Sequence, residues 1–171
     1  METAAVQQGK QDAIVALLDE VTTAAAARGL RNIVCLLTEP GALDALESKY
    51  NRFVALPHLD VLATDPYPLW HGDDIATTQR FCQALVTVCQ RAGKAAQMWI
   101  QGFRVPSGAE PLLGEELQLM VRSGIRDIAL WSYLATAYMS SHACADSARV
   151  WEVVTQAMQD VQRSLNGGVT P

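Results

Sequence analysis

The chain has 171 residues, of which 50% are hydrophobic and 18% are charged, and its formal net charge is -5. This length and composition predict one globular domain with a sizeable core and exclude a disordered chain. The acidic balance, without any basic run, argues against a nucleic-acid partner, and no apolar stretch approaches the roughly 18 residues that a membrane helix needs.

Helices and strands are predicted to alternate along the first half of the chain. Residues 11–28 predict a helix that Gly29 ends, and their apolar side chains recur at helical spacing: Ile14, Leu17, Leu18 and Val21. Residues 32–38 form a continuous apolar run, as in a parallel strand covered on both faces. A helix over 42–53 and a second strand over 59–64 follow.

The second half of the chain repeats the pattern. After a loop rich in proline and aromatic residues, a helix is predicted over 73–91, with Asp73 or Asp74 as its N-cap. Residues 95–101 predict the third strand and 126–132 the fourth, with a short helix over 115–122 between them. The last helix begins at Asp146, and its apolar stripe consists of Val150, Trp151, Val154, Met158 and Val161.

This alternation predicts an α/β fold with a parallel (βα)4 array, about half of a TIM (β/α)8 barrel. The whole chain is expected to form one domain: a preceding helix in 1–30, four strand–helix units in 31–165 and a tail in 166–171. A small open sheet of the flavodoxin type is the alternative. A half-barrel has two open sheet edges, so a missing half-barrel or self-association is expected to cover them.

Several site classes have no signature in this sequence. The four cysteines form no CxxC pair and the three histidines do not cluster, so no metal site is predicted. Without a GxGxxG, GxxxxGK or GxSxG motif, neither a nucleotide cofactor nor a nucleophile elbow is expected. The cysteines, with Cys35 in a buried strand, fit small buried side chains in a reducing compartment. The first ten residues lack a signal-peptide pattern, which favours the cytoplasm.

The most informative segment is Leu59–Trp70, where an apolar run stops at Asp65 and gives way to two prolines and two aromatic residues. Pro66 holds Asp65 out of helical geometry, at a strand end where barrel enzymes place catalytic groups. Asp65 is therefore a candidate acid, base or sugar ligand, or else it accepts backbone hydrogen bonds within its own turn. Tyr67 and Trp70 are candidate sugar-stacking groups or anchors of the loop in the core.

The third strand is predicted to place Gln97, Trp99 and Gln101 on one face and its apolar residues against the helices. Gln101 comes last and is the candidate for binding a hydroxyl group or orienting a water molecule, with Trp99 beside it. The alternative is a glutamine whose hydrogen bonds are satisfied inside the protein.

Further candidates follow the other strands. Trp131 and Tyr133 share a face at the end of the fourth strand, as stacking groups or core packing. Glu39 follows the first strand and is a candidate catalytic acid, or an exposed charge near a helix start. Arg104 and Glu110 lie in the loop after Gln101, where they bind substrate or pair with each other.

Three segments, 60–68, 97–103 and 128–133, resemble the last strands of β/α-barrel glycoside hydrolases. The closest likeness is to the broad group of β-galactosidases with an Asp-x-Tyr-Pro element after strand six. The resemblance implies that the four strands correspond to strands five to eight, with a sugar site at their carboxyl ends. In that group the next strand ends in the catalytic glutamate, and Gln101 lies near that position here.

The resemblance leaves activity open. Retaining hydrolysis needs two carboxylates about 5 to 5.5 Å apart. Asp65 and Glu39 are the candidate pair; otherwise the acid lies in the missing half, or the protein binds a carbohydrate without cleaving it.

Overall fold

The computed structural model describes residues 4–37, 46–131 and 143–167, without the side chains of 4–8 and 165–167. Its described strands form one parallel sheet in chain order: β1 (Ile33–Leu36), β2 (Val61–Thr64), β3 (Ala95–Gln101) and β4 (Asp127–Trp131). The predicted α/β array of four strand–helix units is confirmed. Across these strands the order shows no reversal, whereas a flavodoxin-like sheet has one.

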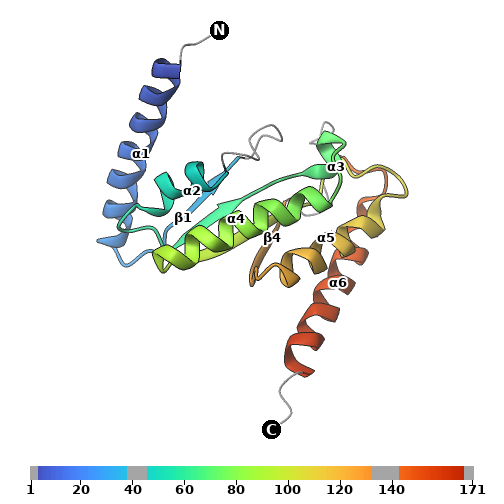
Figure 1. Cartoon of the computed structure of the whole chain (residues 1–171). Helices are drawn as coiled ribbons and strands as arrows, with labels where there is room; N and C mark the ends of the chain where they lie inside the picture. The colour runs from blue at the N-terminus through green and yellow to red at the C-terminus, as the bar shows by residue number, and fades with distance from the viewer. Residues whose placement is uncertain (1–3, 38–45, 132–142, 168–171) are drawn as a thin grey trace.

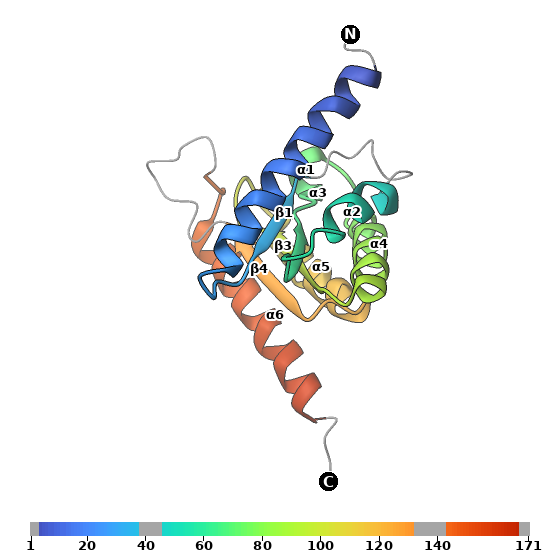
Figure 2. The ribbon, with the colours of Figure 1, turned by 90° about the vertical axis from the view of Figure 1, so that its left-hand side faces the viewer.

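Helices connect the strands and extend beyond both ends of the array (Figure 1). They are α1 (Ala4–Ala26), α2 (Leu46–Val54), α3 (Pro68–His71), α4 (Ala76–Ala92), α5 (Glu110–Arg122) and α6 (Ser147–Gly167). In Figure 2, α1 and α6 project in opposite directions from the body that the strands form with α2, α4 and α5. Within the described ranges, no helix combines the length and the apolarity that a membrane crossing requires.

Three helical features differ from the sequence prediction. The first helix begins at Ala4 rather than at residue 11, because residues 4–10 carry no apolar periodicity that predicts a helix. The helix expected from residue 115 begins at Glu110, since Pro111 occupies the first turn, where proline needs no hydrogen-bond partner. The loop after β2 contains one helical turn, α3, which is too short to show periodicity.

The two faces of the sheet carry different side chains, as strand alternation predicted. Met98 and Ile100 of β3 point into the core beneath the helices. On the other face, the pairing register places Cys35, Ala63, Gln97 and Asp127 in one row across all four strands. Cys35 was expected in a buried strand but is exposed, because β1 is an edge strand with no neighbour on its outer side.

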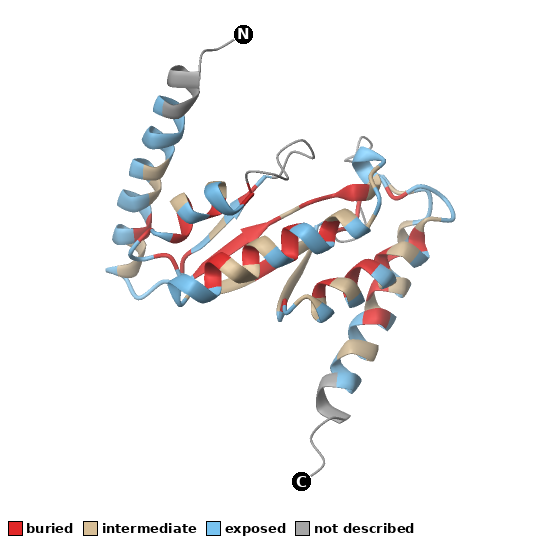
Figure 3. Cartoon of the chain, viewed as in Figure 1, coloured by how far each residue is buried: buried red, intermediate tan, exposed pale blue. Residues whose placement is uncertain are grey.

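The core lies between the sheet and helices α2, α4, α5 and α6, and the buried residues of α4 follow one stripe of that helix (Figure 3). Cys82 and Cys89 lie in this stripe, as the sequence predicted. Burial, together with the nearby charge of Glu116, raises the pKa of Cys82 to about 12, and burial raises that of Cys89 to about 11. Both thiols therefore stay protonated and act as small apolar side chains.

Asn32 joins three segments where the chain enters the sheet. Its side-chain Nδ2 donates to the carbonyl oxygens of Thr22, at 3.0 Å, and His58, at 2.9 Å. Its backbone N–H donates to Oδ2 of Asp60 at 2.7 Å. These bonds fix the end of α1 and the start of β2 against the start of β1, in a region where Asn32 itself is buried.

We expect Asn32→Ala to lower the free energy of unfolding by about 2 kcal/mol, because the buried carbonyl of Thr22 and the part-buried carbonyl of His58 lose their donor. Urea denaturation with a constant m-value would measure this loss. Asn51→Ala, on the exposed side of α2, is the matched control and should change stability by less than about 0.5 kcal/mol. Equal effects of the two substitutions would contradict the role given to Asn32.

Candidate functional site

The parallel sheet brings the carboxyl ends of its strands to one edge, and several of the predicted site residues lie there. Gln101 pairs with Trp131 in the register of β3 and β4. Asp65 follows Thr64, which pairs with Met98, so Asp65 lies level with Trp99. Strand alternation puts Asp65, Trp99 and Gln101 on the face opposite to the helices.

Aromatic rings from the loops after β2 and β3 and from strands β3 and β4 meet at this edge. Phe103 contacts the edges of two rings, Tyr67 at 4.9 Å and Trp70 at 5.4 Å between centroids. Trp99 and Trp131 form a second contact at 6.2 Å. Trp131 is 44% exposed, so one of these indoles remains available to a ligand. Phe103 was not among the predicted site residues, although it lies only two positions after Gln101.

Asp65 is half-buried beside Tyr67. Burial raises the pKa of the Tyr67 phenol well above its usual range, and the Asp65 carboxylate adds to this by its charge and by a hydrogen bond. The phenol therefore stays protonated and donates to the carboxylate. Tyr67 is buried, so its ring supports Asp65 from below rather than offering a free face for stacking.

Gln101 is fully buried, and both ends of its amide are engaged by the main chain. Its Oε1 accepts the Trp70 N–H at 3.0 Å, and its Nε2 donates to the Phe103 carbonyl at 2.7 Å. Gln101 thus ties the loop after β2 to the loop after β3. This arrangement corresponds to the alternative of a glutamine satisfied inside the protein.

Two charged candidates, Arg104 and Glu110, follow β3, and they interact with different partners. The Arg104 guanidinium lies 5.3 Å from the centroid of the Trp70 ring, in cation–π contact. Its φ of 48° places Arg104 in the left-handed region, which is uncommon for a residue other than glycine. Glu110 is buried at the first position of α5, and its charge acts on Arg149 of α6.

Two predicted site residues, Glu39 and Tyr133, lie outside the described residues. Among the residues that the structure describes, no group of histidine, cysteine, aspartate and glutamate side chains could hold a metal ion. Trp70 is exposed at the rim of the site, next to the His71 ring at 4.9 Å.

The helix layer contains a carboxyl group that the sequence analysis missed. Glu116 of α5 is fully buried, and its Oε1 accepts the hydroxyl of Thr78 at 2.8 Å. Burial raises the pKa of Glu116 to about 7, although the bond from Thr78 lowers it. The sequence does not indicate which of the adjacent residues Glu115 and Glu116 is buried. The packing of α4 on α5 decides that Glu116 is the buried one.

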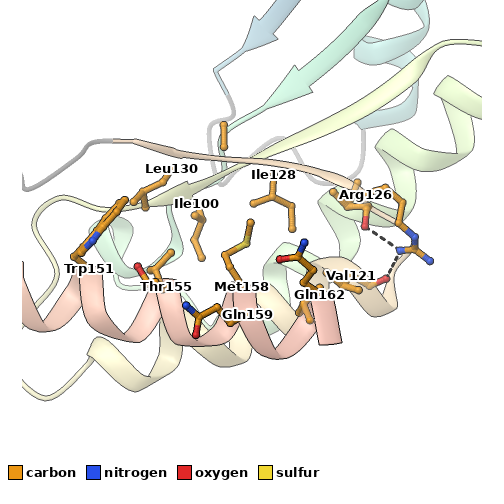
Figure 4. A pocket seen from close by; sticks show the side chains of 14 residues that line it. Ile100, Val121, Arg126, Ile128, Leu130, Trp151, Thr155, Met158, Gln159 and Gln162 are labelled. Atoms are coloured by element: carbon orange, nitrogen blue, oxygen red, sulfur yellow. Dashed lines mark hydrogen bonds between the residues drawn. The ribbon is translucent and has the colours of Figure 1, made fainter. Parts of the chain in front are cut away.

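A groove of about 590 Å³ lies between β4 and α6 (Figure 4), and none of the predicted site residues lines it. Its walls are mainly apolar, with Ile128 and Leu130 on one side and Met158 on the other. The groove is therefore separate from the strand-end site.

No family model, curated protein or solved structure matches this chain.

The raised pKa of Glu116 predicts a pH-dependent stability. Between pH 4.5 and about 7 the folded state retains a proton that the unfolded state releases, so the free energy of unfolding falls as pH rises through this window. Glu116→Gln keeps an acceptor for Thr78 and removes the charge. We expect its stability relative to the unsubstituted chain to increase across the window, as measured by urea denaturation at several pH values.

Glu115→Gln is the control for this experiment, since Glu115 is the exposed neighbour on the same helix. Its stability should follow that of the unsubstituted chain at every pH. A constant difference between Glu116→Gln and the unsubstituted chain would show that burial of the carboxyl does not govern its titration.

Proposed function

We propose that the carboxyl edge of the sheet binds a carbohydrate, in the manner of a glycoside-hydrolase-like domain. The observation that carries the proposal is the exposed indole of Trp131 beside Trp99, on the sheet edge to which Asp65 also belongs. Aromatic faces stack on the apolar faces of sugar rings, while a carboxylate accepts hydrogen bonds from their hydroxyl groups.

The other groups support these contacts rather than making them. Tyr67 donates to Asp65 and holds its carboxylate, and Gln101 holds the two loops on which Trp70 and Phe103 lie. Arg104, exposed above Trp70, is placed to donate hydrogen bonds at the rim.

Hydrolysis is the second function that we propose, with Asp65 and Glu39 as the pair of carboxylates. Its support is the half-buried Asp65 at the strand-end edge, with the Tyr67 phenol donating a hydrogen bond to its carboxylate. In this mechanism Asp65 acts as nucleophile or base and Glu39 protonates the leaving oxygen. Binding alone requires neither proton transfer nor a second carboxylate.

Sugar binding should depend on Trp131 and not on a tryptophan elsewhere on the surface. We expect Trp131→Ala to weaken binding about tenfold, from the loss of one stacking contact. Trp151→Ala on α6 is the matched control, because Trp151 is 40% exposed and Trp131 is 44% exposed. Calorimetric titration of the full chain with a panel of mono- and disaccharides measures both. No binding to any sugar, or equal losses, would contradict the proposal.

Substitution of either candidate carboxylate should remove hydrolysis without removing sugar binding. We expect Asp65→Asn and Glu39→Gln each to lower the rate of aryl glycoside hydrolysis by at least about a hundredfold, while sugar affinity falls much less. The release of the aryl group measures the rate. If the chain binds sugars but releases no aryl group, the proposal of hydrolysis is contradicted and only the proposal of binding stands.

A further inference from the structure

Exposed apolar side chains gather along the two open edges of the sheet. Ten large hydrophobic side chains are exposed within the described residues, and nine of them lie at these edges. On the β1 side they are Ile14, Leu17, Val21, Leu30, Ile33 and Leu37; on the β4 side they are Trp131, Trp151 and Met158. Isolated exposed apolar residues need no explanation, but clusters of this kind mark interaction surfaces.

Only part of the apolar stripe of helix α1 packs against the core. Val15 and Leu18 pack against the core, whereas Leu17 remains 59% exposed. Ile14, Leu17 and Val21 lie within one narrow arc of the helix, next to the packed arc. We name these three residues the outer stripe. Helix α1 leads directly into β1, the first strand of the sheet, so the outer stripe belongs to the element next to this open edge.

The β4 side offers the complementary shape. Helix α6 buries Val150, Val154 and Ala157, and it packs mainly on α5. It does not close onto β4, and the groove of about 590 Å³ separates the two. In Figure 4, Ile128 and Leu130 of β4 point toward Met158 of α6 across this groove, and Thr155, Gln159 and Gln162 lie along it.

The two edges are complementary in hydrogen bonding as well. In an all-parallel sheet, the outer edge of the first strand and the outer edge of the last strand are opposite sides of the ribbon. A parallel contact therefore joins β1 of one chain to β4 of another. Each chain carries one edge of each kind, and two such contacts close two chains into a ring with a two-fold axis.

We propose that the docking partner of this surface is a second copy of the chain, with β1 of each copy beside β4 of the other. Eight parallel strands result, the number that closes a (β/α)8 barrel. When β1 of one copy lies beside β4 of the other, the outer stripe of α1 lies over the partner's β4, on the face of the sheet that carries the helices. The outer stripe then enters the groove between the partner's β4 and α6.

The apolar area is adequate for a stable dimer. Without Trp131, whose indole faces the proposed sugar site, the other eight exposed side chains present on the order of 100 Å² each, and so on the order of 800 Å² in all, about what one partner of a standard interface buries. Pairing both edges also removes the unpaired backbone groups that make open sheets prone to aggregation. Dimerisation of this kind does not require sugar binding, and a measurement of mass alone tests it.

The first experiment determines the mass in solution by size exclusion with light scattering over a wide range of concentration. The full chain should elute at twice 18.6 kDa. Leu17→Glu in the outer stripe and Met158→Glu in the groove should each weaken dimerisation at least about a hundredfold, because each dimer contains the change twice. Gln83→Glu adds the same charge on the exposed side of α4 and should leave the dimer unchanged.

Mixing Leu17→Glu with Met158→Lys provides the decisive measurement. In this mixed dimer one contact is unchanged and the other places a glutamate opposite a lysine, so the mixture should recover dimers that neither variant forms alone. A symmetric β1-to-β1 contact would instead be lost in Leu17→Glu and kept in Met158→Lys, without recovery on mixing. That result would overturn the proposal.

A monomer at every concentration, or open oligomers larger than two chains, would also overturn it. Both substituted positions are exposed, so the variants are expected to fold, and circular dichroism checks this. If either variant fails to fold, Ile14→Glu and Trp151→Glu repeat the experiment at neighbouring positions of the same two surfaces.

Discussion

The parallel pairing of β2 with β3 is the constraint on which the rest of the structure depends. Val61 to Thr64 are buried on both faces of the sheet, and each pairs in register with a residue of β3. Because parallel strands need a crossover, this pairing forces α4 onto one face, where its buried side chains join those of α2, α5 and α6 in the core. It also fixes Asp65 level with Trp99, so the same hydrogen bonds that build the sheet set the spacing of the candidate site.

The sequence predicted the fold where burial was continuous. The third strand was expected over 95–101, as observed, because Gly93 and Gly102 bracket an apolar and alternating run. Predictions failed where tertiary position decided the outcome. Cys35 lies in an apolar run that reads as buried, yet β1 is an edge strand, and nothing within residues 32–38 reveals its place in the sheet.

The candidate site was predictable to the level of the sheet edge. Strand ends with polar and aromatic residues pointed to one place, and the pairing register brings Asp65, Trp99, Gln101 and Trp131 to it. The roles of single side chains were not predictable. Whether Gln101 faces a ligand or the main chain depends on the paths of two loops, and the loops provide an N–H from Trp70 and a carbonyl from Phe103.

The bridge formed by Gln101 has a consequence for molecular recognition. Since one buried amide holds both loops, Trp70 and Phe103 are fixed relative to each other before any ligand arrives. Two loops that would otherwise order separately behave as one preorganised platform, so the loops would lose little conformational entropy when a ligand binds at the proposed site. Selectivity at such a platform comes from the fixed shape of its surface, and a ligand must adapt to the platform rather than reshape it.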